Sequence, residues 1–242
     1  MKSELEVSEY EIKLSSRRFD CKDCKGNDLK CRCRIEIAWD VEKFEACIPM
    51  DHWKATERVI THNESVFNEL ILKYCAKLKT AYRNGYGMIL VGEPGSGKTT
   101  FLSYILVCSI EKGYYPYYTT FARLDHHLKM GFHDTAAARR LEEMLGRSFV
   151  VIDDMGKENF KGGDSYFRAQ FERILRERYE NRMPTLLATN ALTDEWKVLY
   201  GDSVASLLSG RFIRAIMEPG DMRRSPELIE KMEREMGFRG AL

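Results

Sequence analysis

The sequence predicts an α/β fold in which helices cover both faces of a five-stranded parallel sheet, with a small module ahead of it at the N-terminus. Three observations support this prediction. Five short apolar runs recur along the chain, at residues 88–91, 115–120, 148–153, 184–189 and 212–217. Stretches with helical spacing alternate with these runs. Each run is almost continuously apolar, which is typical of strands that are buried on both faces of a parallel sheet.

Residues 1–48 are predicted to form the N-terminal module. Four of the seven cysteines of the chain lie here, in the stretch "CKDCKGNDLKCRC": Cys21, Cys24, Cys31 and Cys33. Four thiolates can form a closed tetrahedral site for structural Zn²⁺, and the "KGND" turn would bring the second pair back to the first. Surface cysteines without a metal are the alternative, since the second pair is spaced more tightly than usual. The alternating stretches "YEIKL" and "RIEIAW" suggest strands that flank the turn.

Residues 49–62 are predicted to be a linker, and residues 63–242 the main domain. Pro49 favours a turn before a possible helix that starts at Met50 or Asp51. From Asn63 onward the spacing predicts one helix that ends at Gly85. One face of this helix carries Val66, Phe67, Leu70, Tyr74, Leu78 and Tyr82.

A phosphate-binding loop follows the first apolar run. Gly92, Gly97, Lys98 and Thr99 fit the G-x-x-x-x-G-K-[S/T] spacing between a strand and a helix. Backbone N–H groups and the helix N-terminus would bind the phosphates of ATP, Lys98 would neutralise the β and γ phosphates, and Thr99 would be a ligand of Mg²⁺. The predicted nucleotide-binding residues are Gly92, Glu93, Pro94, Gly95, Ser96, Gly97, Lys98, Thr99 and Thr100.

Acidic residues end the third apolar run, at the sheet edge where ligands of parallel sheets gather. Asp153 is predicted to hold Mg²⁺ opposite Thr99, and Asp154 to orient or deprotonate a water that is aimed at the γ phosphate. An acidic turn without a catalytic role is the alternative. Glu158 could assist Asp154 or cap the next helix.

Asn190 ends the fourth run, where it could polarise the attacking water or simply form a turn. Arg211 precedes the fifth run and lies far from the phosphates of its own chain. It could serve a neighbouring subunit as an arginine finger, or be an ordinary surface arginine. Arg214 and Arg178 are the competing candidates for the finger.

Composition restricts the function classes only weakly. The 38 basic and 37 acidic residues of the 242-residue chain neither support nor exclude a nucleic-acid partner. The window 16–34 is locally basic and could contact nucleic acid or face solvent. No apolar run approaches the roughly 18 residues that span a bilayer, and the charged N-terminus is unlike a secretory signal. We therefore expect a cytoplasmic protein without a membrane partner.

These motifs, in this order, resemble the DnaC, DnaI and IstB branch of the AAA+ ATPases. The matching stretches are "GYGMILVGEPGSGKTTFL", "FVVIDDMGKE", "ILRERYENRMPTLLATN" and "SLLSGRFIRAIMEPGDMRR", within about residues 50–224. The resemblance implies that residues 92–99 are the Walker A loop, Asp153 and Asp154 the Walker B pair, Asn190 the sensor 1 residue, and Arg211 the finger that acts in trans. Two departures are Asp154, where many AAA+ proteins carry Glu, and a C-terminal stretch too short for a full helical lid, which leaves Arg223 a weak candidate for sensor 2.

The resemblance implies a helicase-loader-like protein of DNA replication. Such a protein forms a homo-oligomer, binds ATP between subunits, engages single-stranded DNA and a hexameric DnaB-like replicative helicase, and releases them on hydrolysis. The cysteine module resembles the zinc-binding domain by which DnaI-type loaders meet their helicase. Candidate DNA contacts are Arg123, Lys129 and Phe132. The alternatives are a transposition regulator that coats duplex DNA and recruits a transposase, a small-molecule P-loop kinase, and an adaptor that binds nucleotide without hydrolysing it.

Overall fold

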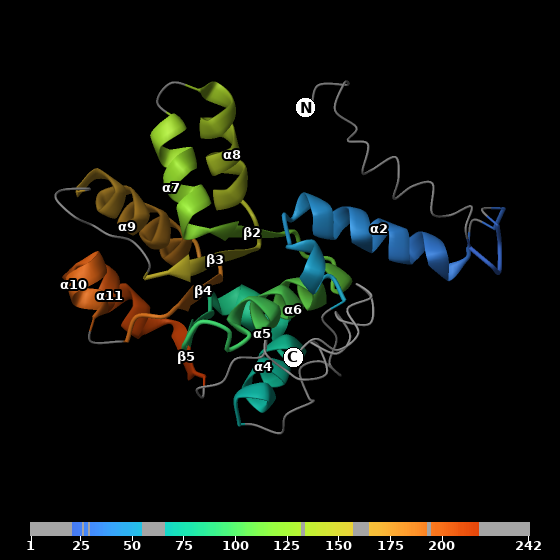
Figure 1. Cartoon of the computed structure of the whole chain (residues 1–242), viewed down its shortest axis with the longest axis horizontal. Coiled ribbons are helices and arrows are strands. Elements are labelled where there is room, and N and C mark those ends of the chain that lie inside the picture. The colour runs from blue at the N-terminus through green and yellow to red at the C-terminus, as the bar shows by residue number, and fades with distance from the viewer. Residues whose placement is uncertain are drawn as a thin grey trace, which may run out of the picture.

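The computed structural model describes residues 21–25, 27–28, 30–54, 66–131, 134–156, 165–192 and 195–217. These residues form a parallel sheet of five strands with helices on both faces (Figure 1), so the predicted fold class is confirmed. The strands are β1 (Gly87–Val91), β2 (Pro116–Thr120), β3 (Phe149–Met155), β4 (Thr185–Thr189) and β5 (Phe212–Ile216). Their order in the sheet is β2-β3-β4-β1-β5, which leaves β2 and β5 at the edges.

The helices connect consecutive strands or precede the sheet. They are α2 (Arg32–Glu45), the short 3-10 helix η2 (Met50–His52), α4 (Val66–Ala76), α5 (Leu78–Asn84), α6 (Lys98–Glu111), α7 (Phe121–Met130), α8 (Thr135–Leu145), α9 (Ser165–Glu180), α10 (Trp196–Tyr200) and α11 (Asp202–Gly210). Within the part of the chain that the structure describes, no helix combines the length and the apolar character that crossing a bilayer requires.

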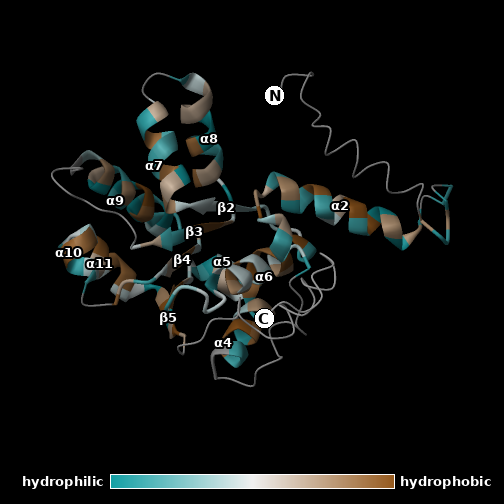
Figure 2. Cartoon of the chain, viewed as in Figure 1, coloured by the Kyte–Doolittle hydropathy of each residue, from teal (hydrophilic) through white to brown (hydrophobic). Residues whose placement is uncertain are grey.

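Two hydrophobic cores lie on the two faces of the sheet. On one face, Met88 and Leu90 of β1 pack with α4, α5 and α6. On the other, Ile89 and Val91 pack with α7, α9, α10 and α11. Because both faces are covered, successive side chains of β1 are all buried, which explains the uninterrupted apolar runs. The covering helices α7 and α9 carry both hydrophilic and hydrophobic residues (Figure 2), as expected of helices that bury one face.

The stretch "RIEIAW" is helical and not a strand, so this prediction is wrong. It belongs to α2, which starts directly after Cys31. The apparent alternation ends with Trp39, and the next apolar residues, Val41 and Phe44, are three apart. Trp39, Val41 and Phe44 all contact the core around α6, whereas Ile35 is 52% exposed. Helical packing of this face therefore outweighs the short alternating pattern. The stretch "YEIKL" and the C-terminal run "SPELIEKMEREMGF" lie outside the described residues.

The helix predicted from residue 63 to Gly85 is divided in two at Lys77. The break turns the buried stripe, so that Leu78 and Ala81 of α5 face the core while Tyr82 is exposed. Gly85 ends α5 as predicted. Its φ of +69° is left-handed, and a Cβ there would lie 2.6 Å from the Cα of Arg182, so glycine suits this cap on both counts.

The segment between α2 and residue 54 packs along the outer edge of β2. The N–H group of Tyr118 donates to the carbonyl oxygen of Ala46 at 2.7 Å. Ala46 and Ile48 are buried in the core, and the indole Nε1 of Trp53 donates to the carbonyl oxygen of Ile48 at 2.8 Å. These contacts attach the segment firmly to the sheet. The predicted division into a module, a linker and a main domain stays a prediction.

Candidate functional site

The predicted phosphate-binding loop connects the end of β1 to the first turn of α6. Gly95 and Gly97 have φ values of +89° and +87°, in the left-handed region that glycine adopts without strain. Gly92 lies close to the end of β5, where a Cβ would approach the Cβ of Met217 to 2.9 Å. These glycines allow the loop to curl at the start of α6, whose N-terminus carries the positive end of the helix dipole.

The ammonium group of Lys98 lies inside this loop. Lys98 is buried, and its Nζ donates to the carbonyl oxygens of Gly92 at 2.8 Å and Glu93 at 2.9 Å. Both of these acceptors belong to the loop itself, so the Lys98 ammonium lies where the loop curls around a ligand. The loop therefore combines a buried cation with a helix N-terminus, which is the arrangement that binds phosphate groups.

Asp153 and Thr99 meet beside the loop, although they lie far apart in the sequence. The Oγ1 of Thr99 donates to Oδ2 of Asp153 at 2.7 Å. Asp153 is buried, and its Oδ1 accepts from the backbone N–H of Asp154 at 2.7 Å. A carboxylate next to a hydroxyl supplies the hard oxygen donors that Mg²⁺ binds together with phosphate oxygens. The two residues thus fit a Mg²⁺ site on the phosphate side of the sheet.

Tyr118 also contacts Asp153, and the sequence reasoning missed it. Its hydroxyl donates to Oδ2 of Asp153 at 2.7 Å. Burial first, and then the charge of Asp153, raise the pKa of Tyr118 above its ordinary value, so the phenol keeps the proton that it donates. The register places Tyr118 of β2 opposite Val151 of β3, two residues before Asp153. The signal in the sequence was the hydroxyl of Tyr118 itself, a polar group within the otherwise apolar second run.

Asp153 and Asp154 lie in different surroundings, although they are adjacent in the sequence. Asp154 is exposed, and its φ of +60° is left-handed. For a residue other than glycine this backbone conformation costs about 1–2 kcal/mol, and such strain is concentrated at functional sites. The pairing of β3 with β4 is irregular between Ile152 and Met155. This irregularity falls at the two aspartates.

Asn190 and Thr100 lie at the same end of the sheet. Asn190 directly follows β4, and its backbone N–H donates to the carbonyl oxygen of Met155 at 3.4 Å, next to the aspartate pair. The Oγ1 of Thr100 is 3.2 Å from Nδ1 of His52. Glu158, Phe132 and Arg223 lie outside the described residues. The structure thus brings the loop, both aspartates and Asn190 together at the carboxyl ends of the strands.

Arg211 lies at the amino-terminal end of the strands, opposite the end at which the phosphate loop lies. Its carbonyl oxygen accepts from the N–H of Gly87, the first residue of β1, whereas the phosphate loop follows the last residue of that strand. The guanidinium lies 4.1 Å from the centre of the Tyr179 ring and donates from Nη1 to the carbonyl oxygen of Tyr179 at 2.8 Å. Arg211 therefore has a defined orientation and no access to the loop of its own chain.

The two competing arginines differ sharply in exposure. Arg178 is only 1% exposed and donates to four oxygen atoms inside the protein. It cannot reach a neighbouring subunit without unfolding this region. Arg214 is exposed and donates to Oγ of Ser209 at 2.8 Å. Of the three candidates for the finger, Arg211 and Arg214 remain available.

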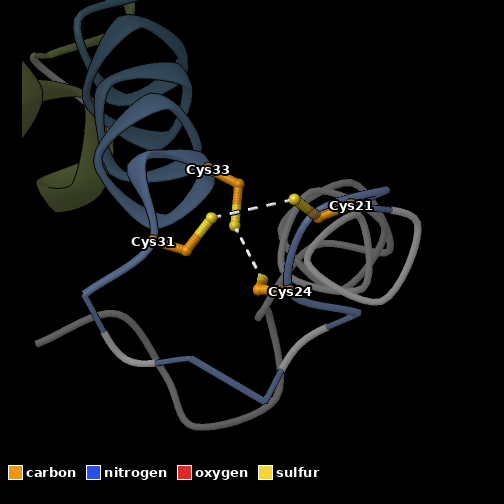
Figure 3. Close-up of side chains that lie close together, drawn as sticks. All are labelled: Cys21, Cys24, Cys31 and Cys33. Atoms are coloured by element: carbon orange, nitrogen blue, oxygen red, sulfur yellow. Dashed lines mark hydrogen bonds between the residues drawn. The ribbon is translucent and has the colours of Figure 1, made fainter.

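The four N-terminal cysteines form one cluster (Figure 3), with all four sulfur atoms within 4.8 Å of one another. The Sγ atoms of Cys21 and Cys31 are 3.8 Å apart, and those of Cys24 and Cys33 are 3.6 Å apart. Sulfur atoms bound at about 2.3 Å in a regular tetrahedron around zinc would lie about 3.8 Å apart. Burial, and then the neighbouring thiols, raise the pKa of Cys33 to about 12, so metal binding here displaces protons. The cluster fits the predicted Zn²⁺ site.

Comparisons with known proteins agree with this fold. The solved structure of the DnaC helicase loader aligns with a TM-score of 0.61 and 22% identity, over 70% of this chain and 100% of that chain. The structure of DnaI aligns with a TM-score of 0.60 and 17% identity, over 72% of this chain and 94% of that chain. At these identities the likeness concerns the fold alone, which is the DnaC-like AAA+ fold.

Sequence comparison identifies relatives of the ATP-binding kind. An ATP-binding protein of insertion sequence IS5376 from Geobacillus stearothermophilus is 27% identical over 117 residues, which are 48% of this chain and 45% of that protein. The match thus spans less than half of the curated relative. The family model described as "IstB-like ATP binding protein" matches residues 46–214, a range that contains the phosphate loop, both aspartates, Asn190 and Arg211. The chain therefore belongs to the family of IstB-like ATP-binding proteins.

Proposed function

We propose that this protein is a Mg²⁺-dependent ATPase. The observation that carries the proposal is the 2.7 Å contact between the hydroxyl of Thr99 and the carboxylate of Asp153, beside a loop that buries the ammonium of Lys98. A nucleotide-binding loop alone would need no buried carboxylate at this position. Membership of an ATP-binding family supports the choice of nucleotide.

Each residue of the site then has a distinct part in hydrolysis. Lys98 exchanges the carbonyl oxygens of its own loop for the β and γ phosphates. Thr99 and Asp153 hold Mg²⁺, which when bound neutralises charge on the phosphates. Tyr118 keeps the carboxylate of Asp153 oriented. Asp154, which faces solvent, orients or deprotonates the attacking water.

Two further residues complete the proposed site. Asn190 adds a second polar group for the attacking water. Arg211 serves the ATP of a neighbouring subunit in a homo-oligomer, because it lies at the edge of the sheet away from its own loop. Its stacking on Tyr179 supports this role, since a finger whose orientation is already defined loses less conformational freedom when it meets a phosphate.

In the cell, we propose that the ATPase engages single-stranded DNA and a hexameric DnaB-like replicative helicase, and that hydrolysis releases them. The fold that it shares with the DnaC helicase loader and DnaI supports this role. The cysteine module ahead of the ATPase region supports it as well, because a compact metal-bound module is suited to contact a partner protein.

A second candidate role is the regulation of transposition, in which the protein coats duplex DNA and recruits a transposase. The observation in its favour is the family match, together with the relative that belongs to an insertion sequence. Both roles use the same ATP site and differ in the form of DNA that they require.

ATP turnover tests the activity and separates the two roles. Purified protein is assayed at several concentrations, alone, with single-stranded DNA and with duplex DNA. Specific activity that rises with protein concentration supports a site shared between subunits. Stimulation by single strands supports the loader, and stimulation by duplex supports the transposition role.

The matched variant for this assay is Asp154→Asn, which keeps the size of the side chain but removes its charge. We expect ATP binding to persist while turnover falls by about 10²- to 10⁴-fold, the usual contribution of a catalytic acid or base. Unchanged turnover in this variant would contradict the assigned role of Asp154. Wild-type protein that binds ATP without any turnover would instead indicate an adaptor.

A further inference from the structure

A cleft of about 1120 Å³ follows the outer edge of β2 and shares only Tyr118 with the proposed ATP site. The end of α2 and the segment 47–50 form one wall, and α7, α8 and the turn after α8 form the other. Figure 1 shows α2 on one side of β2 and the pair α7 and α8 on the other. Aromatic rings and guanidinium groups line the cleft: Phe44, Tyr115, Tyr117, Arg123, Arg140 and Arg147.

The cleft carries an excess of positive charge. Among the described residues, none of the three arginines forms an ion pair. Glu45 and Glu143 also line the cleft, but Glu143 pairs with Arg139 on the same helix at 3.4 Å. Burial raises the pKa of Tyr117 to about 12, and the charges of Arg123 and Arg140, which line the same cleft, oppose this rise.

Tyr115 offers a flat apolar surface to solvent. It is 67% exposed, yet its backbone is held on both sides by Ser148. The N–H of Tyr115 donates to Oγ of Ser148 at 2.7 Å, and its carbonyl oxygen accepts from the N–H of Ser148 at 2.9 Å. An exposed ring on an ordered backbone is a stacking surface for a planar ligand.

The outer edge of β2 does not favour the addition of a peptide strand. Pro116 has no N–H group, and the N–H of Tyr118 already donates to the carbonyl oxygen of Ala46. Two donors that β-augmentation would use are therefore missing. The opposite wall is equally ordered, since Trp53 donates to the carbonyl oxygen of Ile48. The cleft is pre-formed, and its recognition groups are side chains.

We propose that this cleft binds single-stranded nucleic acid, with the arginines on the phosphates and unpaired bases on Tyr115 and Tyr117. The inference rests on the DNA-binding part of the proposed function and assigns it a location. Stacking requires free base faces, which a duplex does not offer. An acidic peptide would pair with the arginines but leave the rings without a partner. Tyr118 lines the same cleft and donates to Asp153, so a bound strand lies next to the ATP site.

Fluorescence anisotropy of a labelled oligothymidylate, titrated with the full chain, tests this assignment. Tyr115→Ala should weaken binding by about five- to a hundredfold, the usual effect of losing one stacked base, and Tyr115→Phe should restore it. Tyr86→Ala, at another exposed tyrosine outside the cleft, is the matched control and should bind as the wild type does.

The arginines are tested by the salt dependence of the same binding. Arg140→Ala should lower the slope of log K against log salt concentration by about 0.7, the loss of one phosphate contact on a single strand. Arg139→Ala is the matched control, because Arg139 precedes Arg140 on α8 but pairs with Glu143. Thermal melting and ATP turnover without DNA should be unchanged in all these variants, since none of the substituted residues belongs to the ATP site.

The outcomes separate this inference from the proposed function. If the wild type binds the oligothymidylate and the cleft variants bind it equally well, the cleft is not the site, although DNA-linked ATPase activity stands. If duplex DNA of the same length or polyglutamate displaces the label better than unlabelled oligothymidylate does, the assigned ligand is wrong. If the wild type turns over ATP but binds no single strand, both the cleft assignment and the loader role fail, and the ATPase assignment stands. Weaker binding confined to the cleft variants supports the assignment.

Discussion

Replacement of Arg178 by methionine tests whether this arginine belongs to the interior or to a subunit interface. The substitution keeps a long side chain and removes the guanidinium. In the native protein that group donates to the carbonyl oxygens of Leu145, Arg147 and Pro184 at 2.8–3.1 Å and to Oγ1 of Thr185 at 3.0 Å. Arg178 thereby joins the end of α8, the turn before β3 and the start of β4.

The expected loss of stability follows from these contacts. Burial lowers the pKa of Arg178 to about 9, so the group remains charged at neutral pH. Methionine leaves four oxygen acceptors without this donor, at a cost of about 1 kcal/mol or more each, or about 4 kcal/mol in total. This is a large part of the roughly 5–15 kcal/mol by which domains are stable.

Urea unfolding followed by circular dichroism measures this loss. We expect Arg178→Met to lower the midpoint strongly at an unchanged slope. Arg214→Met, at an exposed arginine, should change the free energy of unfolding by no more than about 0.5 kcal/mol. The structural role would be refuted if Arg178→Met unfolded at the wild-type urea midpoint, lost ATP turnover, and regained turnover on mixing with a Lys98→Ala protein. That combination would indicate that Arg178 is an arginine finger.

Three further predictions follow from the sites. Arg211→Ala and Lys98→Ala proteins should each lose ATP turnover, and their mixture should recover part of it if ATP lies between subunits; no recovery at any mixing ratio argues against a shared site. Protein purified without chelators should carry close to one equivalent of zinc, and Cys24→Ser should lose the metal while ATP binding persists; metal-free wild type would exclude the zinc site. Burial lowers the pKa of His52 below its ordinary 6.5, so the unfolded state binds more protons, and stability should fall as pH decreases through 6.5 toward that lowered pKa. His52→Gln should reduce this loss, measured by urea unfolding at pH 5 relative to pH 7. An equal loss in wild type and variant would contradict a half-buried neutral imidazole at His52.

Much of the fold and of the ATP site could be predicted because the signals are local. Strands that are buried on both faces must be apolar at successive positions, and all five observed strands overlap the predicted runs. The phosphate loop is contiguous, so its spacing alone places Lys98 and Thr99. The parallel arrangement then places Asp153 and Asn190 at the same edge, because the carboxyl ends of parallel strands lie together.

Local patterns failed where distant segments decide the structure. The stretch "RIEIAW" alternates like a strand, but α2 is helical because Trp39, Val41 and Phe44 pack on a core that includes α6. The sequence suggested Arg178 as a candidate for contact between subunits, but the structure places it among carbonyl oxygens of three separate segments. No spacing in the sequence reports such a position.

The sequence by itself determined the α/β architecture and where the loop, the aspartates and the asparagine of the proposed ATP site lie, because periodicity and contiguous motifs are encoded locally. Only the tertiary structure decided that Tyr118 donates to Asp153, that four cysteines converge, and that arginines and tyrosines from α7, α8 and β2 line one cleft. Each of these arrangements depends on side chains from different segments that folding brings within a few ångströms, and sequence order carries no record of those distances.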